Sequence, residues 1–472
     1  MLFSSTVFIY LFLPIVLIVY YLVLRWNRFL QNLFLLMASL FFYAWGEPKF
    51  VLVMILSIFI NWFFGLWISK MIEKTFYCKI LIGLDVFFNM TILFIFKYLT
   101  FTGQIIQHLT GMDLAVPQIA LPIGISFFTF QAMSYVLDVY RGKGEVQTNI
   151  LYVGLYISFF PQLIAGPIVR YETVAHEIKN RKETWDDFFD GFARFVVGLS
   201  KKVLLSNCFA ILADQAFDSL KGGNSLSVLF AWLGALAYTL QIYFDFGGYS
   251  DMAIGMGRMF GFHFLENFDY PYISTSVTEF WRRWHMSLGT WFRDYLYIPL
   301  GGNRCSKGRH IFNLFVVWFL TGLWHGANYT FIVWGLMCFV LLVFEKETGL
   351  AKMKGKKMLA FRWLYTMLFV VCGWVIFRAE TIGQALDFLA SMFGLRGNPL
   401  ADGLFVGWFS QNIILLAVGC ILSLPVFPAL EKRYGKNSLY GIGKALWLFL
   451  LFVLSIASLI SSSYNPFIYF NF

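Results

Sequence analysis

Charged residues are scarce in this 472-residue chain: only 13% are Asp, Glu, Lys or Arg, whereas 59% are hydrophobic. A water-soluble surface needs about twice that share of charge, so the composition excludes a soluble globular protein. The mean hydropathy of +0.69 and the 20% aromatic content fit a bundle of membrane-spanning helices with aromatic side chains at both interfaces. We therefore predict an all-α polytopic membrane protein.

Two further absences narrow the function. The six cysteines include no CxxC pair, and we interpret them as buried thiols, with no metal site. The net charge of +10 arises from short basic clusters between apolar runs, without the interleaved basic and aromatic residues of a nucleic-acid surface. Clusters of this kind are typical of cytoplasmic loops. We expect membrane lipids as neighbours and no nucleic-acid partner.

The positions of these clusters predict a topology. Thr6–Leu24 lacks a preceding basic region and a small-residue cleavage site, so we expect a retained helix rather than a signal peptide. Basic clusters at 25–28, 70–79, 352–362 and 432–444 are interpreted as cytoplasmic, which places both termini on the extracytoplasmic side of the membrane. Ends on the same side require an even number of crossings, so we expect 10 to 12 helices. The clear spans, by the twenty-residue rule, are 6–24, 29–46, 50–69, 79–97, 226–245, 328–345, 361–379, 404–426 and 445–463.

The middle third is less regular. Broken helices at membrane depth are tolerated only where protein or a water-filled cavity covers the backbone, so either a transporter site or an enclosed active site would give this pattern. The two halves show no inverted repeat, which weakens the transporter interpretation. Between Glu172 and Asp190 the charge density rises, and we interpret this stretch as a solvated amphipathic loop helix. The helix breakers are Pro122, Gly124, Pro161, Gly166 and Pro167.

The segment from Thr275 to His310 is too polar to span, so we expect it at the cytoplasmic interface or tucked into the bundle. On one continuous helix, Arg282 and Arg293 point away from a broad aromatic face. Two interpretations stay open: an interfacial helix whose arginines meet lipid headgroups, or a site that receives the phosphates of a soluble anionic substrate. The aromatic face consists of Phe280, Trp281, Trp284, His285, Leu288, Trp291 and Phe292.

A second histidine stands in the apolar stretch FLTGLWHGAN. An imidazole in such surroundings costs desolvation energy unless it is paired. If His310 marks the cytoplasmic end, ~15 residues of helix carry the chain about 22 Å inward to His325. Gly326 to Asn328 then allow a turn, and Tyr329–Phe344 can return. We expect His325 near the apex of a buried hairpin, where packing and catalytic roles are both open.

Both histidine segments point to a known family. FWRRWHMSLGTWFRDYLYIPLGGNR and FLTGLWHGANYTFIVWG resemble the membrane-bound O-acyltransferases, in their bacterial alginate O-acetylation branch, as do FFYAWGEPKF, LPIGISFFTFQAMSYVLDVYRG, FFPQLIAGPIVRY, YFDFGGYSDMAIGMGRMFGF, ENFDYPY and NPFIYFNF. The resemblance covers essentially the whole chain and implies that the membrane is the cytoplasmic membrane of a bacterium. It implies one integral membrane domain over 1–472, with broken or re-entrant helices around a central channel. Within it we expect peripheral spans over about 1–110, a catalytic core over about 111–350 and further spans over about 351–472.

The resemblance also implies roles for individual residues. His325 matches the family's essential histidine, expected to act as general base on the acceptor hydroxyl, and His285 matches a second histidine that positions the donor, polarises its carbonyl or supports His325. The expected donor is an acyl-CoA, with acetyl-CoA foremost, and we expect no bound cofactor. Candidate contacts for the donor phosphates are Arg282, Arg283, Arg293, Arg304, Lys307 and Arg309. Candidate channel-lining residues are Trp281, Trp284, Trp324 and Asn328.

Three functional hypotheses follow. The first is transfer of an acetyl or other short acyl group from a cytoplasmic thioester to an extracytoplasmic polysaccharide, with an SGNH-type partner. The second is a polysaccharide or lipid-precursor transporter without bond-forming chemistry. The third is the related D-alanyl transfer branch, whose flanking motifs this chain resembles less. Four polar residues in family-like motifs fit either ligand contact or structural hydrogen bonding: Asp138, Asp245, Asp251 and Asn267.

Overall fold

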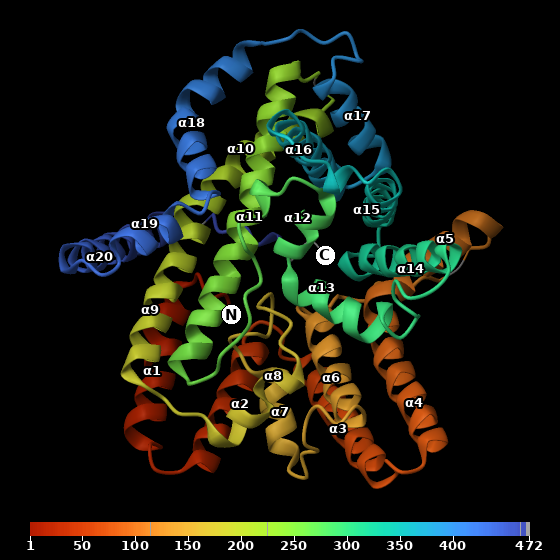
Figure 1. Ribbon diagram of the computed structural model, residues 1–472, viewed down its shortest axis with the longest axis vertical. Coiled ribbons are helices and arrows are strands. Elements are labelled where there is room, and N and C mark those ends of the chain that lie inside the picture. The colour runs from red at the N-terminus through yellow and green to blue at the C-terminus, as the bar shows by residue number, and fades with distance from the viewer. Residues whose placement is uncertain (114, 224, 463, 469–472) are drawn as a thin grey trace. The chain divides into compact units, whose positions relative to one another are not determined.

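The computed structural model describes residues 1–113, 115–223, 225–462 and 464–468, so the end of the NPFIYFNF motif lies outside the described residues. Within these ranges the chain is helical and contains no strand. It divides into two compact units: unit 1 is residues 1–195 with 249–265, and unit 2 is 196–248 with 266–472. Both units can be followed by colour in Figure 1.

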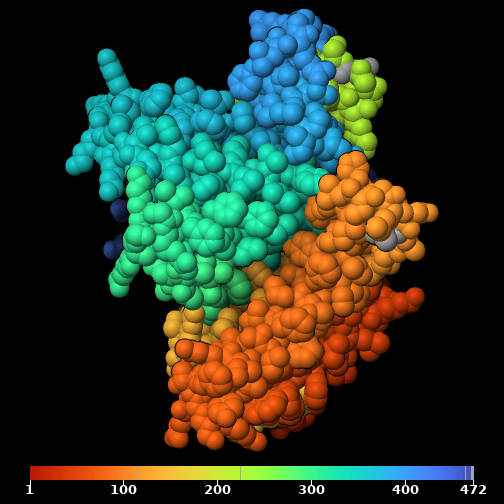
Figure 2. All heavy atoms as spheres, turned by 90° about the vertical axis from the view of Figure 1, so that its right-hand side faces the viewer, coloured from red at the N-terminus to blue at the C-terminus, as the bar shows by residue number. Residues whose placement is uncertain are grey.

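Unit 1 contains the N-terminal helices. α6 is buried along almost its whole length. α3 packs against α4, and Figure 2 shows the outer surface of this part of unit 1 in orange. The helices are η1 (Phe8–Phe12), α1 (Leu13–Ile18), η2 (Val19–Val23), α2 (Arg28–Ala44), α3 (Val51–Lys70), α4 (Thr75–Leu93), η3 (Phe94–Tyr98), α5 (Leu99–Thr110), α6 (Ile125–Tyr140), α7 (Ile150–Ser158), α8 (Tyr171–Asn180) and the start of α9 (Trp185–Ser200).

The helix breakers of the middle third lie in covered backbone, as predicted. α7 ends at Ser158, and residues 159–169 continue without a helix although all of them are buried. Gly124, at φ +75°, is the N-cap of α6, and a Cβ there would lie 3.0 Å from the carbonyl oxygen of Leu163. The two interrupted segments therefore pack backbone against backbone, which a side chain at position 124 would prevent.

The solvated amphipathic helix expected over 172–190 is mostly exposed over 185–190 as predicted, but there it does not stay a separate loop helix. A short α8 is followed by a continuous helix from Trp185 to Lys221, made of α9, η4 (Lys201–Ser206) and α10 (Asn207–Lys221), which is long and apolar enough to cross a membrane. The sequence did not predict this span because a hydropathy profile counts each charged residue as unpaired. In the structure, ion pairs such as that between Arg194 and Asp251 (2.8 Å) compensate these charges.

The nine predicted spans all coincide with helices. Eight helices of the described part are long and apolar enough to cross a membrane, and Phe8–Val23 and Arg28–Ala44 are shorter apolar helices. The prediction of an all-α polytopic membrane protein is confirmed, while the direction of the termini stays a prediction. The longer candidates are Val51–Lys70, Thr75–Thr110, Trp185–Lys221, Val228–Met259, Tyr329–Thr348, Lys356–Arg378, Gly403–Leu422 and Ser438–Ser461.

Unit 2 is built around a tight helical hairpin. α14 and α15 approach closely through glycines: a Cβ on Gly322 would lie 2.5 Å from the carbonyl oxygen of Phe331, and one on Gly335 would lie 2.5 Å from that of Trp318. Small residues permit such contact between membrane helices. Besides the first part of α11 (Val228–Met259), unit 2 contains η5 (Pro271–Ile273), α12 (Val277–Arg283), α13 (Met286–Phe292), η6 (Arg293–Tyr297), α14 (Lys307–His325), α15 (Tyr329–Thr348), η7 (Leu350–Lys352), α16 (Lys356–Arg378), α17 (Ile382–Met392), α18 (Gly403–Leu422), α19 (Val426–Tyr434) and α20 (Ser438–Ser461).

Unit 1 carries a histidine between two carboxylates. His263, in the segment after α11, has Nδ1 2.8 Å from Glu177 Oε1 of α8 and Nε2 3.2 Å from Asp187 Oδ1 of α9. Partial burial opposes protonation, but the hydrogen bonds and charges of the two carboxylates outweigh it and raise the pKa of His263. The ring therefore links α8 and α9.

This cluster predicts a small pH dependence of stability. A raised pKa in the folded state gives a stabilisation that is complete below the unfolded value of about 6.5 and is lost as pH rises through the folded pKa. Because the ring is half-exposed, we expect the Tm in detergent to fall by only roughly 1–2 °C across that interval. His263→Gln should remove this slope, and an identical slope in the variant would contradict the prediction. Thermal unfolding at closely spaced pH values measures it.

Candidate active site

His285 lies at a break between two short helices. α12 ends at Arg283, α13 begins at Met286, and His285 adopts φ +47°. A non-glycine residue in this left-handed region costs about 1–2 kcal/mol. The continuous helix expected over 280–292 is therefore wrong, and α13 takes a direction of its own.

Asn267 holds the break in place. The backbone N–H of Met286 donates to the Asn267 carbonyl oxygen (2.9 Å), and both the backbone N–H and the hydroxyl of Ser287 donate to Asn267 Oδ1 (3.2 and 2.8 Å). His285 Nδ1 lies 3.2 Å from the same oxygen. A carbonyl oxygen only accepts, so Nδ1 carries the hydrogen and Nε2 carries the lone pair. Of the two roles that the sequence left open for Asn267, the structure thus shows structural hydrogen bonding to His285.

The imidazole of His285 is enclosed by aromatic rings. Its centroid lies 6.5 Å from that of Phe246, 6.3 Å from Phe268 and 6.0 Å from Trp324, and the residue is 4% exposed. His285 is outside the candidate spans, and burial lowers its pKa to about 3 because the charged form would lose its hydration. The ring is therefore neutral in the physiological pH range.

The start of α12 is fixed from another helix. Glu345, a buried residue of α15, accepts hydrogen bonds from the backbone N–H groups of Val277 (2.5 Å) and Thr278 (2.9 Å). Ser276 caps the same end by accepting from Glu279 N. A carboxylate at a helix N-terminus satisfies otherwise unpaired N–H groups, so this contact sets the position of α12 relative to the hairpin.

His325 stands at the apex of the hairpin, as predicted. It is the last residue of α14, and α15 begins at Tyr329. Three rings meet the imidazole edge-on, those of Trp324, Trp334 and Phe377, each with its centroid 5.1 Å away. A Cβ on Gly326 would lie 2.2 Å from the Phe331 ring, so only glycine permits this turn.

The two histidines line one cavity. Its volume is about 630 Å³, with α12, α13 and η6 on one side and α14 on the other. His285 and His325, forty residues apart in sequence, are thus brought together in unit 2. Apolar and aromatic side chains form most of the wall, which favours exclusion of water.

Two of the six predicted donor-binding residues line this cavity. Arg282 and Arg293 are exposed residues at its wall, so the expectation that they point away from His285 is wrong. The reason is the break at His285, which removes the single helical face on which that expectation rested. The two guanidinium groups supply positive charge to a cavity whose lining contains no Asp or Glu among the described residues.

The other four basic residues lie outside the lining. Arg283 binds Asp269 (2.7 Å) and Glu279 (3.1 Å). Of the remaining three, Arg304 is exposed, Lys307 pairs with Glu347, and Arg309 donates to the Leu300 carbonyl oxygen.

The predicted channel residues also divide. Trp281 and Trp284 line the cavity, and Trp324 contacts both imidazoles, with centroids 6.0 Å from His285 and 5.1 Å from His325. Asn328 has a structural position: its Oδ1 caps α15, and its Nδ2 donates to the Glu380 carbonyl oxygen (2.9 Å).

Comparison with known proteins now identifies the family. A model of the membrane-bound O-acyltransferase family matches residues 145–382, about half of the chain, including both histidines. The chain belongs to this family. It is 41% identical over 494 residues to the probable alginate O-acetylase of Pseudomonas putida, with 100% of both chains covered. It is 32% identical over 523 residues to the peptidoglycan O-acetyltransferase of Helicobacter pylori, covering 100% of this chain and 98% of the relative.

The D-alanyl branch matches less of the chain. The teichoic acid D-alanyltransferase of Bacillus subtilis is 28% identical over 281 residues, which is 55% of this chain and 69% of the relative. The sequence-based recognition of the family is confirmed, and with it the classification as a membrane-bound O-acyltransferase.

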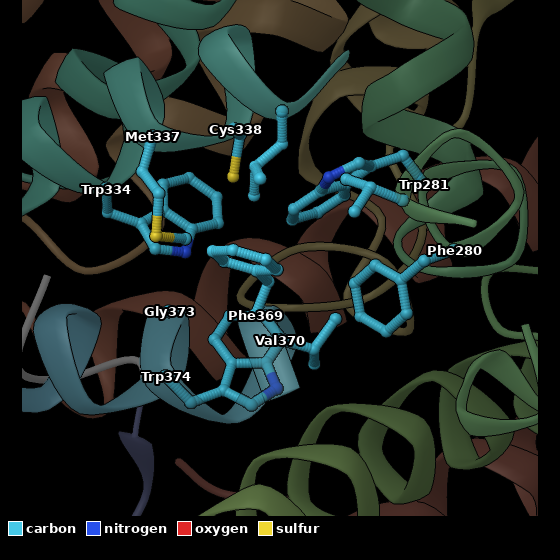
Figure 3. Close-up of a pocket in the computed structure, with 11 residues that line it drawn as sticks. Phe280, Trp281, Trp334, Met337, Cys338, Phe369, Val370, Gly373 and Trp374 are labelled. Carbon is cyan, nitrogen blue, oxygen red and sulfur yellow. The ribbon is translucent and has the colours of Figure 1, made fainter. Parts of the chain in front are cut away.

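A smaller chamber adjoins the two-histidine cavity. It lies between α12, α15 and α16 and has a volume of about 20 Å³, enough for about one small group. Trp281 lines both spaces, and we interpret its indole as the partition between them. Figure 3 shows the surrounding side chains, which include Trp281, Trp334, Met337, Cys338, Phe369 and Trp374.

Proposed function

We propose that the protein transfers an acetyl group from acetyl-CoA on the cytoplasmic side to a hydroxyl acceptor that serves polysaccharide modification outside the membrane. One observation carries the proposal: the two histidines that match the family pattern line a single cavity together with Arg282 and Arg293. A neutral imidazole supplies the base, and the guanidinium groups supply contacts for an anionic donor.

In the proposed reaction, His325 takes the proton of the acceptor hydroxyl as its oxygen attacks the thioester carbonyl. The carbon–sulfur bond then breaks, the acyl group is left as an ester, and the departing thiolate receives the proton from His325. The apolar wall keeps out water that would hydrolyse the thioester.

The tautomer of His285 favours one of its candidate roles. With its hydrogen on Nδ1 and directed at Asn267, neutral His285 has only the Nε2 lone pair for other contacts. A lone pair accepts a hydrogen bond but does not polarise a carbonyl oxygen. We therefore assign His285 the role of accepting from an N–H or O–H group of a substrate, which positions that substrate.

Family membership favours acyl transfer over the transporter hypothesis. The greater coverage by the O-acetyltransferases favours acetyl over D-alanyl transfer. We further propose that a polysaccharide, reached directly or through an SGNH-type partner, is the final acceptor.

Labelled acetyl-CoA and purified protein test the proposal. Alginate and peptidoglycan fragments serve as acceptors, each with and without an SGNH-type protein. Labelled ester is expected in at least one mixture. Export of polysaccharide from proteoliposomes without any labelled ester would overturn the proposal in favour of the transporter, and labelling from a D-alanyl donor alone would favour the third hypothesis.

The partition at Trp281 predicts selectivity for short acyl groups. Trp281→Ala would join the small chamber to the larger cavity, so we expect the ratio of butyryl to acetyl transfer to rise about tenfold, which corresponds to the burial of roughly two methylene groups. Transfer rates with butyryl-CoA and acetyl-CoA measure the ratio.

Phe369→Ala is the matched control, because it enlarges the chamber and leaves the partition in place. An unchanged ratio in Trp281→Ala, or an equal rise in both variants, would contradict the partition.

A further inference from the structure

A third buried histidine lies beside the cavity. His310, on the first turn of α14, is 5% exposed. Its Nε2 lies 2.8 Å from the hydroxyl of Tyr297, and its Nδ1 lies 2.5 Å from Lys346 Nζ of α15. Tyr297 is the last residue of η6 and lines the same cavity as His285 and His325. The proposed acyl transfer uses neither His310 nor Lys346.

The direction of these hydrogen bonds follows from the chemistry of the three groups. An exposed lysine ends in an ammonium group, which has donors only, so His310 Nδ1 accepts. The one hydrogen of the neutral imidazole is then on Nε2 and is donated to the Tyr297 oxygen. The tyrosine hydroxyl keeps its own hydrogen for another acceptor.

The three-group relay also fixes the direction of that hydroxyl. The ammonium of Lys346 occupies the lone pair of His310 Nδ1, so the His310 N–H stays directed at the Tyr297 oxygen and the hydroxyl hydrogen is left for a different acceptor. An ordinary packing tyrosine has no such charged group behind it.

The cavity side presents matching groups. Arg282 and Arg293 line it with Tyr297, and no carboxylate is among the described lining residues. Arg293 is partly neutralised by Asp294 (2.7 and 3.1 Å). A neutral hydrogen-bond donor would therefore strengthen the binding of an anion here. A group of donors with no carboxylate beside it fits an anionic group with several oxygens, such as a phosphate.

We propose that Tyr297 donates a hydrogen bond to a phosphate oxygen of the acyl donor, and that His310 and Lys346 are positioning residues that hold its hydroxyl for this contact. This inference rests on the proposed function, because it assigns the phosphate-binding end of the same cavity. It adds three residues to the donor site, none of which is among the six basic residues predicted from sequence.

Binding of CoA to the purified full-length protein in a phosphate-free detergent tests the proposal without turnover. Tyr297→Phe removes the hydroxyl and keeps the ring, and we expect a Kd for CoA about tenfold higher, as for one hydrogen bond to a charged group. Pantetheine, which has no phosphate, should bind both proteins equally. Tyr295→Phe is the matched control, because Tyr295 lies in the same turn, packs on Trp291 and is absent from the cavity lining.

A double-mutant cycle separates positioning from general damage. His310→Phe should weaken CoA binding by a similar factor, and the double variant should be little weaker than either single one, because both remove the same contact. Multiplicative losses would overturn the positioning role of His310. The contact between Tyr297 and the phosphate would be overturned if Tyr297→Phe has the wild-type Kd for CoA. It would also be overturned if this variant loses affinity for pantetheine and for CoA by the same factor.

The same measurements distinguish this inference from the proposed function. If the wild type binds CoA but transfers no acetyl group, and Tyr297→Phe weakens CoA binding, the proposed function is refuted and the phosphate site is retained. Acetyl transfer with an unaltered CoA Kd in the variant would do the reverse. The assignment to the donor would be overturned if the wild type does not bind CoA. It would also be overturned if Tyr297→Phe weakens the binding of added phosphatidylglycerol and leaves the binding of CoA unchanged.

Discussion

His325→Ala is expected to lower kcat for acyl transfer by about 10²- to 10⁴-fold, the usual contribution of a general base. The KM for the donor should change little, because the arginines and Tyr297 at the cavity wall are untouched. The imidazole is 6% exposed and is met edge-on by three aromatic rings. None of these rings has a basic nitrogen, so none of them can take the proton in place of His325. Initial rates with labelled acetyl-CoA measure the effect.

Two controls make this result specific. His325→Gln keeps most of the volume and one hydrogen-bond acceptor but has no basic nitrogen, and it should be nearly as inactive as alanine. His176→Ala, at an exposed position of α8, should keep wild-type activity. Retention of more than a tenth of the wild-type rate by both His325 variants would remove His325 from the role of base.

Asn267→Leu is expected to lower kcat/KM by about 10- to 100-fold. Leucine offers no acceptor, so the His285 N–H and the Ser287 hydroxyl would be left without their shared partner, at a cost of about 1–3 kcal/mol. The tautomer of His285 would no longer be fixed, and the break between α12 and α13 would loosen. Steady-state kinetics with acetyl-CoA, together with CoA binding, check the prediction.

Asn267→Asp is the informative partner of this variant. A carboxylate keeps an acceptor for Nδ1 and should restore much of the activity that leucine removes. It should also raise the pKa of His285 by placing a negative charge beside it, so its activity should decline at a higher pH on acidification than that of the wild type. Equal activity of Asn267→Leu and the wild type would show that the tautomer of His285 is irrelevant to catalysis.

Much of the fold could be predicted because long apolar runs have few alternatives. The nine predicted spans coincide with helices for that reason, and the hairpin apex at His325 followed from a three-residue gap between two such runs. The helix from Trp185 to Lys221 could not be predicted in the same way, since its charges are compensated by residues distant in sequence, as Arg194 is by Asp251.

The candidate site was predictable in its residue types but not in its geometry. Resemblance marked the two histidines, and the cavity brings them together. Helical periodicity placed Arg282 and Arg293 away from His285 because it assumed one continuous helix. The left-handed backbone at His285 depends on Asn267, 18 residues earlier, so the local sequence does not predict the break. The contact of His310 with Tyr297 and Lys346 likewise depends on three separate segments. Periodicity describes one helix at a time, whereas these contacts arise between helices.

The left-handed backbone at His285 also determines how its chemistry can be dissected. Alanine at this position would lose the imidazole and still bear the backbone penalty, so any measured loss would combine two effects. Glycine adopts φ +47° without that penalty and keeps the break. His285→Gly therefore leaves an imidazole-shaped vacancy in an otherwise intact wall, into which free imidazole or its methylated derivatives can diffuse. Chemical complementation by such molecules, graded by their basicity, reads out the role of that nitrogen separately from the fold that presents it.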